Sequence, residues 1–471
     1  MKNWNIKKEV VSREEMPEHH RLTPTLFWPH LVALGVGAIV GTGILTLIGV
    51  GAGKAGPAVI LSFAIAGVIC ACAALAYAEV ATMIPASGSA YTYSYVVFGE
   101  LIAWIIGWSL ILEYSLVVSA VAVGWSGYLA PLLNIPVELA NGPHAGGVVN
   151  LPAIFIIAVV AALLIAGTRE SANLNAALVL VKLAALAIFV AVALPFFNAD
   201  NLEPFMPYGF PRSGPSGSEV GVMAAAAIIF FAFYGFDAIA TAAEEAKNPG
   251  RDLAIGIVGS MLLCVLIYMA VAATAVGALA YSRFANSPEP LALILREIGQ
   301  PWAARILAIS AVAALPTVIL AFFYGQSRIF FTMARDGLLP QSLARVSSRG
   351  SPVRITLFTA AVVAVIAGIF PLDEIAALAN AGTLAAFIAV CAAMLVLRRR
   401  EPNRERRFRT PLPWLVGLGG IAGCLYLFWS LPVQTQTYFL IWNLLGVAVY
   451  LLYASGQAAR TRDETASARS V

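Results

Sequence analysis

Four glycines interrupt the first long apolar stretch of the sequence, at Gly35, Gly37, Gly41 and Gly43. In a membrane-spanning helix they would lie near the middle of the bilayer. Each glycine costs a helix about 1 kcal/mol relative to alanine, and it permits a non-helical backbone that lines a cavity. The same spacing also suits close packing between two helices. This motif alone therefore favours neither a binding site nor a packing contact.

A second glycine motif lies beside a carboxylate, because Gly235 follows an aromatic cluster and Asp237 comes two residues later. A carboxylate within a membrane span is costly and is therefore a candidate functional group. An interrupted helix frees amides that bind anionic groups and carbonyls that bind cationic groups. Two such interruptions together predict a site for a zwitterion such as an amino acid.

Two more charged residues, Lys182 and Glu113, lie inside apolar stretches. Lys182 is too deep for its ammonium to reach the interface easily, and a lysine at that depth can exchange its proton. It could couple transport to a proton gradient, or it could brace the carbonyls of a broken helix. For Glu113 we leave open bracing of its helix, pairing with a polar group, and recognition of a substrate amine.

The other reactive residue types form no catalytic or metal-binding pattern. The five cysteines lie in apolar runs without nearby histidines, and no nucleotide-binding motif of the GxxxxGK[ST] type occurs. We therefore expect a protein that is not an enzyme and that needs no metal or cofactor, with a proton gradient as its energy source. Basic residues lie between apolar runs, which argues against binding to nucleic acid.

Long apolar helices must position these groups, since 60% of the 471 residues are hydrophobic and only 11% are charged. About 20 apolar residues cross a bilayer. The pattern predicts an all-α polytopic membrane protein with twelve transmembrane helices, at residues 29–53, 57–84, 97–131, 151–168, 172–197, 219–246, 252–280, 302–334, 353–370, 373–397, 411–431 and 436–455.

The two interruptions fall in the first and sixth of these helices, which run in opposite directions if the topology alternates. That arrangement is typical of an inverted repeat of five helices. We predict one repeat at 29–197, a second at 219–397, and two extra helices at 411–455. Helices 1 and 6 would both be broken at mid-membrane.

Lysines and arginines are concentrated in the segments that lie inside if the N-terminus is cytoplasmic. This bias predicts that the tails at 1–28 and 456–471 both lie in the cytoplasm. The arginine run from Arg398 to Arg409 acts mainly as such a signal, and contact with anionic lipid is its alternative role.

Several motifs resemble the amino acid–polyamine–organocation superfamily and, within it, bacterial members of the cationic amino acid transporter family. The resemblance extends from about Leu26 to Tyr453. Its motifs are the segments 35–44, 85–93, 98–100, 107–114, 234–237, 244–249, 324–328 and 335–340.

The resemblance implies a substrate site at the two breaks. The substrate carboxylate would bind the amides at Gly41-Thr42-Gly43-Ile44, and its ammonium would face the carbonyls of Ile39, Phe231 and Tyr234. Phe231 is similar to the aromatic residue that closes over the substrate.

The resemblance also implies roles around the site. Lys182 matches a lysine that proton-coupled members are thought to use, in contact with the carbonyl of Gly37. Asp237 matches a gating or proton-sensing carboxylate, and the stretch from Tyr91 to Tyr95 resembles a loop that lines the inner gate.

The eighth helix departs from the family pattern at Pro316, which could kink it, and Phe322 and Phe323 follow. Apart from Glu113, the sequence has no acidic residue near the middle of the membrane that is plainly available to pair with the cationic side chain of a substrate. We therefore expect proton-coupled symport of small to medium neutral L-amino acids by alternating access. The alternatives are a cationic amino acid or polyamine exchanger and an amino-acid-sensing receptor. The sequence leaves open whether a small accessory membrane subunit binds the protein.

Overall fold

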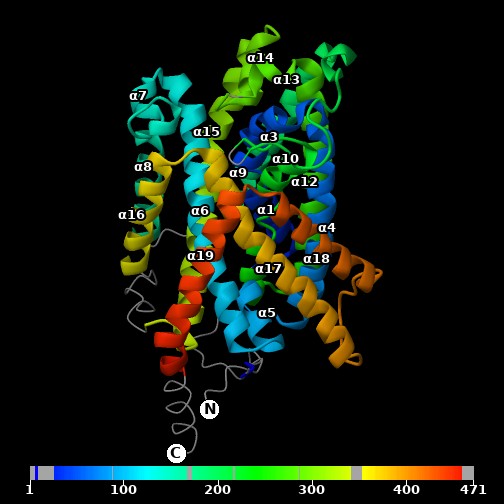
Figure 1. Cartoon of the computed structure of the whole chain (residues 1–471), viewed down its shortest axis with the longest axis vertical. Coiled ribbons are helices and arrows are strands. Elements are labelled where there is room, and N and C mark those ends of the chain that lie inside the picture. The colour runs from blue at the N-terminus through cyan, green and yellow to red at the C-terminus, as the bar shows by residue number, and fades with distance from the viewer. Residues whose placement is uncertain are drawn as a thin grey trace, which may run out of the picture.

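A computed structural model describes residues 6–8, 26–86, 88–166, 172–215, 218–285, 287–340 and 353–458. The described chain is helical, and its only β structure is two isolated bridges. Nine helical runs in this part of the chain are long and apolar enough to span a membrane, and three shorter apolar helices accompany them. The prediction of an all-α polytopic membrane protein is confirmed (Figure 1).

Each of the twelve predicted ranges coincides with helix. The bounds are α1 (Trp28–Ile39) with α2 (Thr42–Leu45) and α3 (Leu47–Ala55), α4 (Val59–Met83), α6 (Glu100–Leu133), α8 (Leu151–Ala166), α9 (Ala172–Ala193), α10 (Val222–Ile229) with α11 (Asp237–Thr241), α12 (Pro249–Ala278), α15 (Pro301–Arg335), α16 (Val353–Ile369), α17 (Leu372–Arg400), α18 (Pro413–Ser430) and α19 (Val433–Val449).

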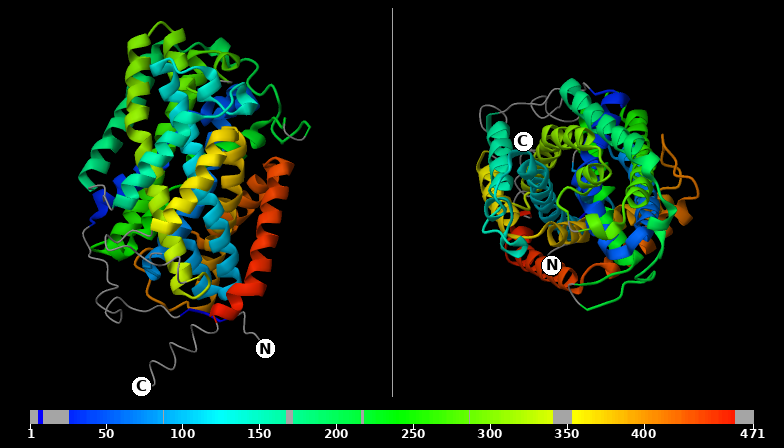
Figure 2. Two further views of the ribbon diagram at one scale, coloured as in Figure 1. Left: turned by 90° about the vertical axis from the view of Figure 1, so that its left-hand side faces the viewer. Right: turned by 90° about the horizontal axis from the view of Figure 1, so that it is seen from above.

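Helices at equivalent positions of the two predicted repeats pack against each other: α4 on α12, α6 on α15, and α8 on α16. The first helix of each repeat also packs on the second helix of the other, because α1 contacts α12 and α10 contacts α4. This pairing is the one expected for the predicted inverted repeat, which stays a prediction. All eight residues of α10 are buried, and Figure 2 shows the helical bundle from the side and from above.

Short helices mark the two ends of the molecule. The helices α7 (Val137–Ala140), α13 (Tyr281–Phe284) and α14 (Pro290–Glu297) lie at the top of Figure 1, and α5 (Ser89–Val97) lies near the bottom. The sequence predicts that the end with α5 faces the cytoplasm.

Candidate functional site

The first transmembrane helix is broken where its glycines gather. The α1 helix ends at Ile39, and Val40 and Gly41 have non-helical backbone angles before the four-residue α2 begins at Thr42. A second irregularity at Thr46 separates α2 from α3. The amides of the residues that open α2 have no preceding helical turn to supply them with carbonyls. They are therefore available to an anionic group.

The sixth transmembrane helix is broken at the predicted place. A 3-10 turn at Phe230–Ala232 follows α10, and non-helical backbone continues to α11, which begins at Asp237. Gly235 adopts a φ of +119°, which side-chain-bearing residues rarely tolerate. A Cβ there would also lie 3.0 Å from the backbone carbon of Ala38 in α1.

The two breaks touch through their backbones. A Cβ on Gly43 would clash with the Cα of Ala232, so glycine is needed where α2 meets the turn after α10. Together with the contact between Gly235 and Ala38, this brings the end of α1 and the start of α2 against the break in the sixth helix. The geometry suits a small molecule that carries both charges.

Side chains from three neighbouring helices bond to the backbone carbonyls of the first helix. Lys182 Nζ donates to Gly37 O at 2.9 Å, Tyr268 OH to Ile39 O at 2.9 Å, and Tyr128 OH to Leu45 O at 2.6 Å. All three side chains are buried. They hold the broken segment in place, and each carbonyl keeps a second lone pair for another donor.

Lys182 connects three helices. Besides Gly37 O on α1, its ammonium contacts Thr317 Oγ1 on α15 at 3.2 Å, while Lys182 itself belongs to α9. Thr317 in turn donates to Ala314 O at 2.8 Å. The contact with Gly37 implied by the family resemblance is present, and its role in proton coupling stays a prediction.

Asp237 closes the break in the sixth helix. Its carboxylate accepts from Gly235 N at 3.2 Å and from Tyr114 OH at 2.8 Å. Glu113, next to Tyr114 on α6, is also buried, but neither of its oxygens has a hydrogen-bond partner among the described residues. It packs against α17, where a Cβ on Gly382 would lie 3.1 Å from its own Cβ.

Aromatic and aliphatic side chains surround the breaks. The Phe231 ring lies 5.1 Å from that of Tyr234, and Phe322 lies 5.3 Å from Tyr114 and 6.5 Å from Tyr234. Val318 on α15 is the side chain nearest to Gly41, where a Cβ would lie 3.6 Å from it. The wall beside the break is therefore apolar.

Pro316 does not interrupt its helix, because α15 continues from Pro301 to Arg335. A proline lacks the amide that would bond to the carbonyl four residues earlier, here that of Val312. Trp125 Nε1 donates to that carbonyl at 2.9 Å. The side chain from α6 thus replaces the missing helical bond.

Tyr91 and Tyr95 lie on α5, and their bonds run to the ends of other helices. Tyr91 OH donates to Asp336 Oδ2 at 2.9 Å, next to the end of α15, and Lys8 Nζ contacts the same carboxylate at 2.7 Å. Tyr95 OH donates to Glu100 Oε2 at 3.0 Å. These two tyrosines are thus apart from the residues that bond to the breaks, and their role in gating stays a prediction.

Sequence reasoning missed several residues that support the site. Tyr268, Tyr128 and Trp125 bond to carbonyls near the breaks, and Asn380 on α17 donates to Ala227 O and Ile228 O at 2.7 and 3.0 Å. Each has a polar group within an apolar run. That shared feature was the available signal, since a buried polar group in a membrane needs a partner.

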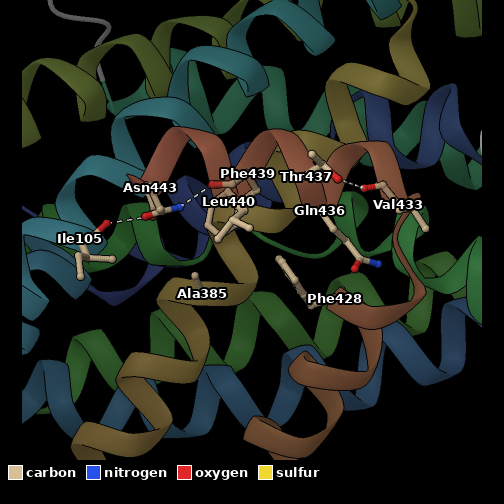
Figure 3. Close-up of a pocket in the computed structure, with 10 residues that line it drawn as sticks. Ile105, Ala385, Phe428, Val433, Gln436, Thr437, Phe439, Leu440 and Asn443 are labelled. Atoms are coloured by element: carbon tan, nitrogen blue, oxygen red, sulfur yellow. Dashed lines mark hydrogen bonds between the residues drawn. The ribbon is translucent and has the colours of Figure 1, made fainter. Parts of the chain in front are cut away.

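A groove on the side of the bundle is separate from this site. It lies between α6, α17, α18 and α19 and is lined mainly by apolar side chains such as Phe428 and Leu440 (Figure 3). Its amide side chains already have backbone partners, because Gln436 donates to Leu431 O and Asn443 to Phe439 O. None of the predicted site residues lines it.

Comparisons with known proteins agree on one family. A model of the amino acid permease family matches residues 26–453. The chain is 44% identical to the branched-chain amino acid permease BcaP of Bacillus subtilis, over 90% of this chain and 91% of that protein. It is 41% identical to a methylthioribose transporter of the same organism, over 95% and 97%. It is 38% identical to a vacuolar cationic amino acid transporter of Arabidopsis thaliana, over 86% and 64%.

Proposed function

The chain belongs to the amino acid permease family, a family of transporters and not of enzymes, and from this premise we propose a proton-coupled importer of neutral L-amino acids. Branched-chain aliphatic amino acids are the first candidates. The substrate would bind between the two broken helices, and the site would open alternately to either side of the membrane.

The observation that carries this proposal is the contact between the two breaks at Gly43 and Ala232. The substrate carboxylate would bind the amides of Thr42, Gly43 and Ile44. Its ammonium would bind the second lone pair of Ile39 O and the carbonyls of Phe231 and Tyr234. A molecule that carries both groups satisfies both helix ends at once.

The walls support a neutral aliphatic side chain. Val318 faces Gly41, and Phe322 packs on Tyr114 beside the site. Of the two acids near the breaks, Asp237 is held by Tyr114 and Gly235, and Glu113 packs against α17. A cationic substrate would depend on Glu113, whose oxygens have no hydrogen-bond partner among the described residues, because Asp237 is already engaged.

Proton coupling would act through Lys182. In its ammonium form the side chain makes charge-assisted bonds, which are roughly twice as strong as neutral ones, to α1 and α15. Loss of the proton would weaken the connection between α9 and the first half of the broken helix. That half could then move, so that the protonation state of Lys182 would affect the substrate site.

A second candidate substrate comes from the relatives. The methylthioribose transporter is almost as similar in sequence as BcaP, although methylthioribose has neither a carboxylate nor an amine. The third candidate substrate is a cationic amino acid, because the plant relative is named a cationic amino acid transporter. The helix ends at the breaks favour an amino acid over methylthioribose, and the apolar side chains of Val318 and Phe322 favour a neutral amino acid over a cationic one.

The chain would lie in the inner membrane of a bacterium with both termini in the cytoplasm, would need no cofactor beyond the proton gradient, and could accept a small accessory subunit. Uptake of radiolabelled leucine into proteoliposomes tests the proposal. We expect uptake to require an inward proton gradient, and to be reduced by excess valine but not by arginine or methylthioribose. Competition by arginine or methylthioribose alone would overturn the substrate class. Uptake independent of the gradient would overturn proton coupling.

A further inference from the structure

The end of α17 and the loop that joins it to α18 contain seven arginines at residues 398–409, and the structure divides them by their partners. Arg398 forms two bonds of 2.6 Å to the carboxylate of Glu79 in α4, and Arg406 Nε lies 3.2 Å from the same group. Arg400 donates to Val97 O, and Arg404 to Met83 O. These four arginines fasten the loop to the helical bundle.

Arg407 is placed differently. Its side chain crosses the first turn of α12, where a Cβ on Gly250 would clash with Arg407 Cδ and would lie 3.2 Å from one terminal guanidinium nitrogen. A side chain larger than hydrogen at position 250 would require the Arg407 side chain to move aside. Arg407 lines a pocket together with Asn248 and Phe408. Arg251, from the same turn of α12 as Gly250, lines it as well.

The charges in this pocket are not balanced by the described protein. Arg407 has one ionic contact, at 3.7 Å to Glu405, and both side chains are largely exposed, so that pair contributes little. Arg251 has no carboxylate within ion-pair distance in the part of the chain that the structure describes. Asp252, in the same turn, is buried and does not line the pocket.

Arg251 in the first turn of α12 and Arg407 beside it both add positive charge at the start of this helix, where Asp252 supplies a negative charge. This 30-residue helix places the positive end of its dipole at Pro249 and Gly250, where cations are disfavoured and anions are stabilised. An anion in the pocket would offset the helix dipole and both guanidinium groups. A phosphate group suits this arrangement because arginine binds phosphate oxygens in pairs.

The surroundings indicate the membrane interface. Leu412, Trp414 and Leu415, at the start of α18, are 70%, 53% and 69% exposed and follow the loop directly. At the start of α1, Phe27 and Trp28 are exposed as well, and Lys247 Nζ lies 4.0 Å from the Phe27 ring. Aromatic and basic residues in such a band are typical of the headgroup level.

We infer that the pocket formed by Arg251, Arg407, Phe408 and the first turn of α12 binds the phosphate headgroup of an anionic phospholipid. The acyl chains would lie along the exposed apolar residues that open α18. The lipid would join the loop to α12, the helix that holds Tyr268 on the first broken helix. This inference does not depend on the identity of the transported substrate.

Thermal unfolding of the purified full-length protein, titrated with phosphatidylglycerol, tests the inference. We expect a saturable rise in the unfolding temperature with phosphatidylglycerol and none with phosphatidylcholine. Each arginine that contacts the headgroup contributes about 1 kcal/mol of attraction, so the double substitution R251Q/R407Q should weaken the apparent affinity by roughly 30-fold, which corresponds to about 2 kcal/mol. The charge-preserving R251K/R407K should recover most of it.

Arg399→Gln is the matched control, since Arg399 is an exposed arginine of the same run and does not line the pocket. It should leave the affinity unchanged. Equal binding by R251Q/R407Q and the native protein, or an equal loss in Arg399→Gln, would overturn the inference. An identical saturable shift with inorganic phosphate would also overturn the lipid as its ligand.

Discussion

Lys182 Nζ lies 2.9 Å from Gly37 O, so a charged side chain of α9 bonds to the last turns of α1 just before that helix breaks. The same ammonium reaches Thr317 on α15. Substrate site and proposed proton site thus share one segment of backbone. In the proposed mechanism, loss of the proton from Lys182 would weaken a bond to the broken helix that forms the substrate site.

Tyr268→Phe should weaken substrate binding. The substitution removes the hydroxyl that bonds to Ile39 O and keeps the ring contacts with Phe63 and Phe233. Loss of a bond that orients a buried carbonyl costs about 1–1.5 kcal/mol, so KM for leucine uptake should rise roughly tenfold with little change in kcat. Tyr450→Phe, which removes a buried hydroxyl bound to Glu100, should not change KM. An unchanged KM in Tyr268→Phe would contradict this role.

Gly43→Ala should disrupt the contact between the two breaks. Its Cβ would clash with the backbone of Ala232, and overpacking of this kind costs about 1–3 kcal/mol. We expect a lower unfolding temperature and loss of transport. Gly41→Ala is the matched control, because its Cβ would make ordinary contact with Val318 at 3.6 Å.

Gly41→Ala should fold normally and shift the preference from leucine towards smaller amino acids, since the added methyl group narrows the site. Competition of alanine and leucine for uptake measures that shift. Equal stability of the two variants would contradict the close approach at Gly43.

Glu79→Gln should destabilise the protein, because Glu79 is 1% exposed and balances Arg398 and Arg406. Removing one partner from a buried ion pair costs about 3–5 kcal/mol. Thermal unfolding in detergent measures the effect. Glu401→Gln should change little, since Glu401 is 46% exposed in its pair with Arg404. Similar unfolding temperatures for the two variants would show that the ion pairs of Glu79 do not hold the loop between α17 and α18 in place.

The sequence was informative about the breaks because glycine in a helix and a carboxylate within a membrane both cost free energy. Such residues therefore indicate a structural or functional role. It located the breaks at Gly41 and Gly235 and the buried Lys182. It also placed the helices, although the polar residues 434–436 lie within the first turn of α19 and not before it.

The sequence could not identify the partners of the freed carbonyls. Tyr268 and Tyr128 contact α1 and α2 across 229 and 83 positions of the chain, and nothing in local spacing predicts such pairs. The same holds for Trp125, which bonds to the carbonyl that Pro316 leaves without its helical partner in α15. These are properties of packing, and they depend on which helices become neighbours.

Proton-driven accumulation by Lys182→Ala tests the central claim most directly. Radiolabelled leucine would be followed into proteoliposomes with an acidic exterior, beside leucine counterflow without a gradient as a control for a folded, substrate-binding protein. We predict that Lys182→Ala keeps counterflow but loses accumulation above equilibrium. Accumulation at the level of the native protein would contradict the assignment of Lys182 as the proton-coupling residue.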